Sequence, residues 1–283
     1  MPGLPFPFAM VIRPRCVFDS LGGLFFRAVV IAVVLLAHAS FQVCHAAAPT
    51  QGAGPAPVHQ VREVYRLPHE PGAFTQGLFF VHGRLFETTG RHGQSRLMEL
   101  NPQTGRVLRS RFLPAQYFGE GAVAVGQRII WLTWTSQQAF VFDLETFEPV
   151  GEYPYQGEGW GLTFDGARLI MSDGGSSLVL RDPQSFEPLG SVQVTDGGVA
   201  VDLLNELEWA AGFVYANVWR ESRIAVIDPG TGSVVCWLDL EPVVPLVLDP
   251  SAVANGIAFD ERNDCLLITG KLWPEMICVQ PLP

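Results

Sequence analysis

The stretch WGLTFDGARLIMSDGGSSLVLRDPQSFEPLGSVQ, residues 160–193, consists of short apolar segments separated by turn-forming residues. None of these segments has helical periodicity over three turns, and each is rich in residues that favour strands. Asp182-Pro183-Gln184-Ser185 is typical of a tight turn, because Pro presets one backbone angle and Asp binds its own backbone. Residues 160–193 therefore predict one small unit of antiparallel strands.

The same pattern occurs five times along the chain. The units open at Gln76-Gly77-Leu78, Glu120-Gly121-Ala122, Trp160-Gly161-Leu162, Asn205-Glu206-Leu207 and Asn255-Gly256-Ile257. The second residues of these tripeptides are 44, 40, 45 and 50 positions apart. A period of this length with about four strands in each unit is typical of a β-propeller blade. We therefore predict an all-β fold, a five-bladed β-propeller.

The ring of blades also has to be closed. The last unit contains only three strands, GIAFD, CLLITG and MICVQP, while residues 61–67 (VREVYRL) form an unassigned strand before the first unit. An unpaired outer edge would be open to aggregation. We expect the N-terminal strand to complete the last blade and close the ring.

Composition limits the class of protein. The chain has 283 residues, with 18 basic and 28 acidic side chains and a net charge of -10. Nucleic-acid binding requires a basic face, so we expect no nucleic-acid partner. With 48% hydrophobic and 11% aromatic residues the chain is not disordered. We expect the propeller at residues 61–283, preceded by a Pro/Gly/Ala linker at residues 47–60.

The first 46 residues resemble an export signal. Arg13, Arg15 and Arg27 precede an apolar run at residues 28–37, and small residues follow at 46–48. This order is that of a secretory signal peptide, and ten apolar residues are few for a membrane span. We expect residues 1–46 to be a signal peptide or an N-terminal anchor. The mature protein would be periplasmic or extracellular, without stable membrane insertion after cleavage.

Three cysteines fall in the predicted folded part: Cys236, Cys265 and Cys278. Cys265 and Cys278 lie on segments that read as neighbouring strands of a hairpin, and an oxidising compartment would permit a disulfide between them. The alternative is that all three are small buried hydrophobic residues, and we favour this slightly.

The repeats bring chemically different residues to one place. The first strand of each blade lines the channel of a propeller, so the residues that open the units should face one mouth: Gln76, Glu120, Trp160, Asn205 and Asn255. The ends of the second strands add Thr89, Trp134, Asp173, Trp219 and Lys271. Unlike residues at equivalent positions indicate a site rather than repeated packing. Lys271 is the only lysine, so this position either needs an ammonium or has one by chance.

Structural interpretations compete with these functional ones. Each Trp alone would fit a partly buried core, Asn205 and Gln76 could cap turns, and Asp173 is typical of a turn. Glu120 lies between glycines in FGEG, which leaves its carboxyl sterically open. Glu158, in QGEGWG, is the second candidate acid.

Other chemistries lack their sequence signals. All six histidines precede residue 93, and no His/Cys cluster has metal-ligand spacing. A nucleophile elbow, a dinucleotide-binding loop and a P-loop are all missing from the sequence. We expect no metal at the site and no cofactor. A carboxylate, amides, an ammonium and aromatic rings suit general acid–base chemistry on a small neutral or cationic substrate.

A series of short motifs runs in order from about residue 62 to 280: FTQGL (74–78), ETTGRHGQS (87–95), FGEG (118–121), LTW (132–134), GWGLTFDG (159–166), NELEW (205–209), ANVW (216–219), NGIAFD (255–260) and TGKLWP (269–274). With these motifs the chain resembles the glutaminyl-peptide cyclotransferases (glutamine cyclotransferases) of the plant and bacterial type. His92 departs from the pattern, since relatives often carry Tyr there. Some relatives bind a structural calcium ion, but we see no loop here that requires one.

The resemblance implies a five-bladed propeller that converts N-terminal Gln of peptides or proteins to pyroglutamate and releases ammonia. It places Glu120, Lys271 and Asn205 in a pocket with Phe74, Gln76, Phe118, Trp134, Trp160 and Trp219. We expect Glu120 to act as general acid and base and Lys271 and Asn205 to be catalytic as well, while the other residues bind the substrate. We expect a monomer. The alternative function is a non-catalytic propeller that binds a peptide or sugar at the same mouth, because fold alone does not determine function.

Overall fold

The computed structural model describes residues 54–282, which form strands, turns and loops without a helix. The described residues all belong to one compact unit. The predicted signal peptide or anchor at residues 1–46 lies outside the described residues. Within residues 54–282 there is no helix long and apolar enough to cross a membrane. The described fold is all-β, as expected.

Three consecutive parts of the chain each form a four-stranded antiparallel sheet with its strands in sequence order. The first contains β2 (Thr75–Val81), β3 (Arg84–Thr89), β4 (Arg96–Leu100) and β5 (Val107–Phe112). The second contains β6 (Gly119–Val125), β7 (Arg128–Thr133), β8 (Gln138–Asp143) and β9 (Pro149–Pro154). The third contains β10 (Leu162–Phe164), β11 (Leu169–Met171), β12 (Ser177–Arg181) and β13 (Pro188–Gln193). These sheets correspond to three of the predicted units.

The remaining strands form one eight-stranded sheet in the order β16-β17-β18-β19-β1-β22-β21-β20. It contains the last two predicted units, β16 (Leu204–Ala210), β17 (Phe213–Val218), β18 (Arg223–Ile227), β19 (Val234–Asp239), β20 (Ala254–Asp260), β21 (Cys265–Gly270) and β22 (Glu275–Pro281). A short hairpin, β14 (Thr195–Asp196) and β15 (Val199–Ala200), precedes them and was not predicted.

The N-terminal strand β1 (Val58–Pro68) joins these two units. Residues 58–60 pair in parallel with β19, and residues 61–68 pair antiparallel with β22. The expected pairing of residues 61–67 with the last unit is therefore confirmed. The strand begins three residues earlier than expected, inside the segment predicted to be a linker, because those residues continue onto β19.

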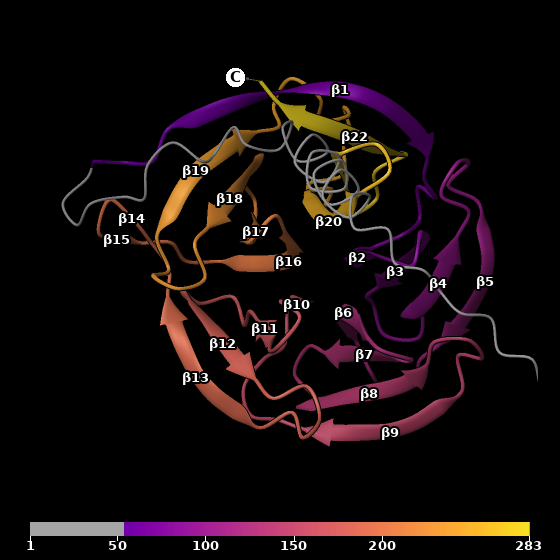
Figure 1. Ribbon diagram of the computed structural model, residues 1–283. Coiled ribbons are helices and arrows are strands. Elements are labelled where there is room, and N and C mark those ends of the chain that lie inside the picture. The colour runs from indigo at the N-terminus through magenta and orange to yellow at the C-terminus, as the bar shows by residue number, and fades with distance from the viewer. Residues whose placement is uncertain (1–53, 283) are drawn as a thin grey trace, which may run out of the picture. The chain divides into compact units, whose positions relative to one another are not determined.

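The sheets surround a common centre (Figure 1). The strands β2, β6, β10, β16 and β20 lie nearest to it, while β1 runs along the outside of β22 and β19. Apolar side chains fill the space between neighbouring sheets. For example, Phe79 and Phe86 of the first sheet share a buried cluster with Trp131 and Phe142 of the second. Burying a side chain of this size contributes roughly 1.5–3 kcal/mol. The apolar side chains therefore pack between the sheets, and the centre of the ring is left for polar residues.

Short turns of one type connect the outer strands. Asp143 Oδ1 accepts hydrogen bonds from the backbone N–H groups of Glu145 and Thr146, at 3.0 and 2.8 Å. Asp182 Oδ1 does the same for the two corresponding residues of the third sheet. Each turn ends with a phenylalanine in the left-handed region, Phe147 with φ 60° and Phe186 with φ 64°. The turns were predicted from these Asp residues, and their side chains do bind the backbone.

Four of the innermost strands are interrupted where the predicted site residues lie. The pairing register shifts between Thr75 and Gly77, Gly119 and Ala122, Leu204 and Leu207, and Ala254 and Ile257. Such a bulge removes a residue from the regular ladder and redirects its side chain. The bulges contain Gln76, Glu120, Asn205 and Asn255, so the sequence places one of these polar residues at each interruption.

Close approach of the innermost strands explains two of the glycines that open the units. Gly121 N–H donates to the carbonyl of Trp160 at 2.7 Å, and a Cβ on Gly121 would lie 2.7 Å from that oxygen. A Cβ on Gly161 would lie 2.1 Å from the carbonyl oxygen of Asn205. Any larger residue would force the neighbouring sheets apart.

Cys265 and Cys278 form a disulfide between β21 and β22, with their Cα atoms 5.9 Å apart. The reading that we favoured slightly, in which these two cysteines are simply buried hydrophobic residues, is wrong for this pair. Both residues are fully buried, as that interpretation predicted. The antiparallel pairing of β21 with β22 also brings their sulfur atoms together.

Candidate active site

Glu120 lies at the bulge that begins β6, one of the strands nearest the centre of the ring (Figure 1), and only 5% of its surface is exposed. Its Oε1 accepts a hydrogen bond from Gln76 Nε2 at 2.9 Å. Its backbone carbonyl accepts from Thr88 Oγ1 at 2.8 Å and from Trp131 Nε1 at 3.0 Å, so the displaced backbone is held in place. The carboxyl is buried, oriented by an amide and supported by fixed neighbours.

The environment of Glu120 changes its acidity. Burial raises the pKa of Glu120 well above its ordinary value, because the charged form loses hydration. The positive charge of Lys271 opposes this rise in pKa, and the negative charge of Glu158 adds to it. A raised pKa makes the carboxyl a better proton acceptor when ionised and keeps its protonated form available over a wider pH range, which suits general acid–base catalysis.

Lys271 follows β21 and is also buried, with 6% of its surface exposed. Burial lowers the pKa of Lys271, and the charge of Glu120 partly opposes this effect. Its Nζ lies 5.0 Å from the centre of the Phe74 ring, a distance at which a cation and an aromatic face attract each other. Lys271 is therefore a buried ammonium beside the candidate site and not a surface cation.

Aromatic side chains form two groups around these charges. Phe118 makes edge contacts with Phe74, His92 and Trp134, with ring centres 6.2, 5.6 and 5.6 Å apart. Trp160 and Trp219 meet at 89° with their ring centres 5.9 Å apart. Both Trp160 and Trp219 are partly exposed, and Trp134 is 38% exposed. These rings offer accessible apolar faces and are not closed into a core.

Glu158 connects the tryptophans. Its Oε2 accepts hydrogen bonds from the indole N–H groups of Trp134 at 2.6 Å and of Trp160 at 2.9 Å. The sequence suggested Glu158 only as a second candidate acid, two residues out of phase with the ring. The contacts instead make it an acceptor that orients two rings of the pocket.

Two asparagines complete the polar part of the site. Asn255 Nδ2 donates to Gln76 Oε1 at 2.9 Å, which orients the amide that binds Glu120. Asn205 is 2% exposed, and its Oδ1 has no hydrogen-bond partner among residues 54–282. A buried acceptor without a partner is costly unless a ligand supplies the donor. Asn205 is therefore suited to bind an N–H group of a substrate.

Two second-tier candidates have structural contacts instead. Asp173 is exposed, and its Oδ1 accepts a hydrogen bond from Gly175 N–H at 2.9 Å, as expected for a residue that stabilises a turn. Thr89 Oγ1 accepts from the backbone N–H of Arg96 at 3.2 Å and so joins β3 to β4. Neither side chain contributes to the group around Glu120.

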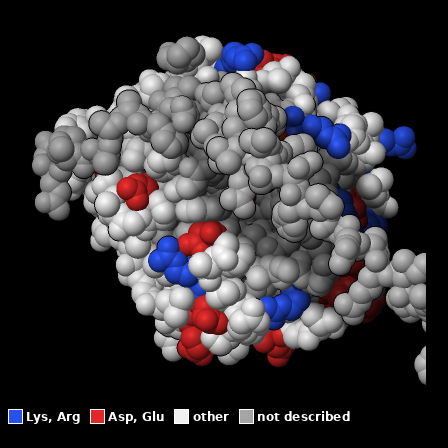
Figure 2. All heavy atoms as spheres, in the orientation of Figure 1, with Lys and Arg blue, Asp and Glu red and all other residues white. Residues whose placement is uncertain are grey.

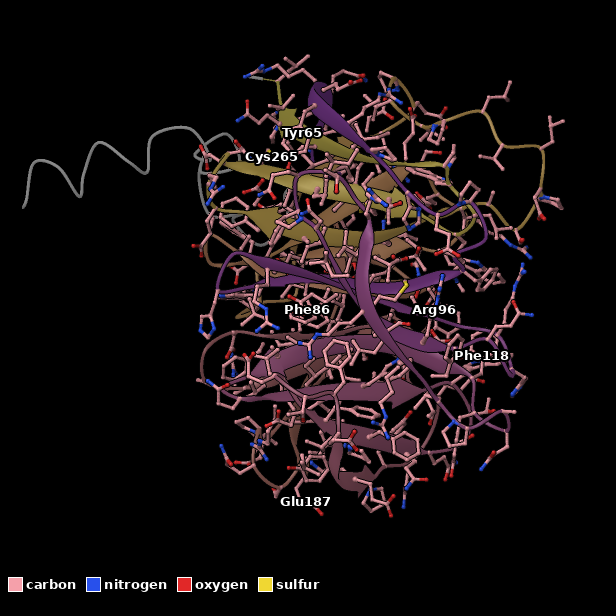
Figure 3. The ribbon with its side chains drawn as sticks, turned by 90° about the vertical axis from the view of Figure 1, so that its right-hand side faces the viewer. Tyr65, Phe86, Arg96, Phe118, Glu187 and Cys265 are labelled. Carbon is pink, nitrogen blue, oxygen red and sulfur yellow. A yellow bond between two sulfur atoms is a disulfide. The ribbon has the colours of Figure 1, made fainter. Side chains whose placement is uncertain are left out.

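The site lies at one end of the sheets. In Figure 3, Phe118 and Arg96 lie toward one end of the strands, and Tyr65 and Cys265 lie toward the other. A cavity of about 1040 Å³ is lined by residues at the Tyr65 end, among them Val81, Ala124 and Asp260, and by none of the predicted site residues. Figure 2 shows the face opposite Phe118, where the described acidic and basic side chains are interspersed. This cavity is thus separate from the candidate chemistry.

Asp260, Cys265 and Cys278 have potential metal-binding atoms within 4.8 Å of one another. The two sulfur atoms are joined in the disulfide, so they offer no thiolate to a metal. The residues around Glu120 do not form such a group in the part of the chain that the structure describes.

An all-β ring of sheets that holds a buried carboxyl, an ammonium and amides among accessible aromatic rings is suited to acid–base chemistry. The sequence profile of the family described as glutamine cyclotransferase matches residues 33–280, and the chain belongs to this family.

Two relatives agree with this assignment. A glutaminyl-peptide cyclotransferase of Arabidopsis thaliana is 36% identical over 225 residues, which cover 77% of this chain and 70% of the relative. The crystal structure of Myxococcus xanthus glutaminyl cyclase is similar with a TM-score of 0.75 and 36% identity, covering 81% of this chain and all of that one.

Sequence reasoning missed some residues of this region. The orienting role of Glu158 has no signal in the repeat, because the equivalent positions of the first two units carry Phe74 and Phe118 and no carboxylate. No role was predicted for Glu206, the second residue of its unit. Its two carboxyl oxygens accept from Leu78 N–H at 3.2 Å and Ile257 N–H at 2.8 Å, so it links three innermost strands across the ring.

Proposed function

We propose that this protein converts the N-terminal glutamine of peptides and proteins to pyroglutamate and releases ammonia, with Glu120 as general acid and base. Membership of the glutamine cyclotransferase family supports the reaction. The observation that carries the role of Glu120 is its burial at the ring centre, with Gln76 bound to its carboxyl and the Lys271 ammonium nearby.

We infer that the sheets are the five blades of a β-propeller, with β1 as the strand that closes the ring. The four-stranded order of three sheets supports this, as does the pairing of β1 with both β19 and β22. In such a propeller the bulges that carry Gln76, Glu120, Asn205 and Asn255 lie at one mouth of the central channel.

The substrate would bind through its apolar and polar parts separately. The methylene groups of the glutamine side chain would pack on Trp160 and Trp219, next to Phe118 and Trp134. Asn205 Oδ1, which has no partner among the described residues, would accept a hydrogen bond from the substrate amine. These contacts hold the folded conformer in which amine and amide meet, and orientation of this kind accounts for much of intramolecular catalysis.

In the reaction the α-amino nitrogen attacks the side-chain amide carbon, and the bond from that carbon to the amide nitrogen breaks. Glu120 accepts a proton from the attacking amine and gives it to the departing nitrogen, which leaves as ammonia. The five-membered lactam remains, and no oxidant or reductant is needed. Lys271 and Gln76 donate hydrogen bonds to the amide oxygen as it gains charge, which stabilises the transition state.

We further propose that the reaction needs neither a metal at the site nor a cofactor, and that the protein is an exported monomer. The acid–base groups named above are sufficient for the proton transfers, so no Lewis acid has to be invoked. A calcium ion, if bound, would have a structural role.

Incubation of the protein with Gln dipeptides tests the function directly. We expect release of one ammonia per peptide with formation of the pyroglutamyl product, detected by mass spectrometry. Dipeptides with an acetylated N-terminus are the control, because their nitrogen cannot attack. The reaction should continue in EDTA. Saturable binding of Gln peptides without ammonia release would instead indicate the non-catalytic alternative, and loss of activity in EDTA that zinc restores would contradict the metal-free mechanism.

A further inference from the structure

A buried ion pair lies next to the site and has no part in the proton transfers described above. His69 directly follows β1, and Glu87 lies on β3. His69 Nε2 and Glu87 Oε1 are 2.9 Å apart, and each side chain is only 1% exposed. Charged groups are rarely buried unless they are paired, and keeping such a pair costs desolvation. A pair that is kept at this cost beside the site is therefore a candidate for a specific role there.

Glu87 connects the pair to the segment that carries Gln76. Glu87 Oε1 also accepts a hydrogen bond from Thr75 Oγ1 at 2.7 Å. Thr75 immediately precedes Gln76, and its backbone carbonyl accepts from Asn255 Nδ2 at 2.9 Å. The same Asn255 nitrogen binds the Gln76 side chain. The carboxyl of Glu87 thus holds the residue before the bulge from which Gln76 reaches Glu120.

His69 connects the pair to the segment that carries Lys271. Its Nδ1–H donates to the backbone carbonyl of Trp273 at 2.7 Å, two residues after Lys271. Between them, Leu272 has a left-handed backbone with φ 62°, and its N–H donates to the carbonyl of Ala73 at 2.7 Å. Residues 271–273 therefore follow a strained path that is held against the segment before Gln76.

The groups around His69 favour its charged form. Burial lowers the pKa of His69, but the charge of Glu87, the hydrogen bonds to Glu87 and Trp273 and the charge of Glu70 outweigh this, so the pKa is raised. The pair also has two neutral neighbours. Thr75 donates to Glu87, and Thr269 Oγ1 lies 3.2 Å from His69 Nδ1. Glu70 forms an ion pair with Arg96, whereas Glu87 binds His69 directly.

We propose that His69 and Glu87 are a positioning pair that holds the segments carrying Lys271 and Gln76 in register around Glu120. Neither residue touches the substrate. The pair acts through Thr75 and Trp273, on two sheets that meet where the ring closes. Its catalytic consequence rests on the proposed function, whereas its effect on the position of Lys271 does not.

The position of Lys271 can be read from the titration of Glu120, because the ammonium charge lowers the pKa of that carboxyl. The test follows the carboxyl carbon of Glu120 by NMR in protein labelled at glutamate, assigned with Glu120→Gln. We expect Glu87→Gln and His69→Gln to raise the pKa of Glu120 by about 0.5 pH unit, a part of the roughly 1–3 units by which a nearby opposite charge lowers the pKa of a carboxyl. Lys271→Met should raise it further.

Tyr65→Phe is the matched control. Tyr65 also lies on β1, and its OH donates to Asp260 Oδ2 at 2.8 Å, but it is near the other end of the strands (Figure 3). This variant loses one partly buried hydrogen bond, so it reports general loosening of β1. It should leave the titration of Glu120 unchanged.

Thr75→Val keeps the ion pair and the side-chain shape and removes only the hydrogen bond to Glu87. It should raise the pKa of Glu120 by a smaller amount than the pair variants do. It also keeps the proposal testable if the pair variants fail to fold. Unchanged titration of Glu120 in Glu87→Gln and in Thr75→Val would overturn the proposal. An equal shift in Tyr65→Phe would also overturn it, because the effect would then be unspecific.

Kinetics provide a second readout on Gln dipeptides. Misplaced catalytic groups should lower kcat roughly tenfold to a hundredfold in Glu87→Gln, with KM within about twofold. Unchanged kcat in folded Glu87→Gln would contradict the positioning role. If the wild-type protein had no activity, the proposed function would fail, but the NMR titration would still decide whether the pair positions Lys271.

Discussion

Gln76 Nε2 donates a hydrogen bond of 2.9 Å to Glu120 Oε1, although the two residues lie on different sheets and are 44 positions apart in the chain. Each occupies the bulge of its innermost strand. The contact therefore depends on two neighbouring sheets being in the correct register. It also fixes which carboxyl oxygen the amide of Gln76 binds.

Glu120→Gln should lower kcat at least about a hundredfold with little change in the folded structure, because it keeps the shape and removes the proton acceptor. Steady-state kinetics on a Gln dipeptide measure this. Glu158→Gln is the control. It should mainly raise KM, since the indole groups of Trp134 and Trp160 lose a charged acceptor. A larger kcat loss in Glu158→Gln than in Glu120→Gln would reverse the two assignments.

Lys271→Arg should lower kcat/KM at least about tenfold although the charge is kept. The guanidinium is wider and planar, and it would have to fit a buried position beside the Phe74 ring. Lys271→Met should be at least as damaging, because it removes the donor for the amide oxygen. Wild-type kcat/KM in the arginine variant would show that the ammonium has no specific role.

The pH dependence of kcat/KM should reflect Glu120. Its carboxyl must be ionised to accept a proton, and burial raises its pKa well above the ordinary value. Activity should therefore rise with pH through that raised pKa rather than near pH 4.5. Lys271→Met should move this rise to higher pH, because the ammonium lowers the pKa of Glu120. A rise with a midpoint near pH 4.5 in the wild type would contradict a buried general base.

Stability should fall as pH rises, partly through His69. A group with a pKa raised in the folded state stabilises the fold below its unfolded value, about 6.5 for His, and loses this effect as pH rises through the folded pKa. Burial also raises the pKa of Glu206 and Glu208, which adds a decline of the same sign. Melting temperatures at several pH values should therefore show a weaker decline in Glu87→Gln. An identical decline would mean that His69 is not charged in the fold.

Deletion of residues 58–68 should cause aggregation, because the loss of β1 exposes the edges of β19 and β22. Light scattering and size-exclusion chromatography check this, with Tyr65→Phe as a soluble control that keeps the strand. A soluble truncated protein with the melting temperature of the full chain would show that β1 does not close the ring.

The repeat predicted which polar residues lie at the bulges of the innermost strands. Gln76, Glu120, Asn205 and Asn255 occupy equivalent positions in the units, so a fixed period brings them together whatever the exact strand boundaries are. Asp143 and Asp182 were predictable for a local reason, since their side chains bind the backbone two and three residues ahead.

Contacts without a periodic signal could not be predicted in this way. His69 lies outside all five units, and its pairing with Glu87 depends on where β1 ends against the first sheet. Glu158 is out of phase with the ring residues, so its link between two indoles follows only from the loop conformation. The disulfide was considered from the neighbouring strands, but the sequence alone did not favour it over simple burial.

The bulges affect how the residues of the candidate site can be substituted during evolution. A residue in a bulge does not contribute to the ladder of its strand, so its side chain can be replaced while the backbone pairing on either side remains. Four polar residues of the centre come from four such interruptions on separate innermost strands. Substrate preference could therefore be altered one position at a time, by single substitutions that leave the architecture intact.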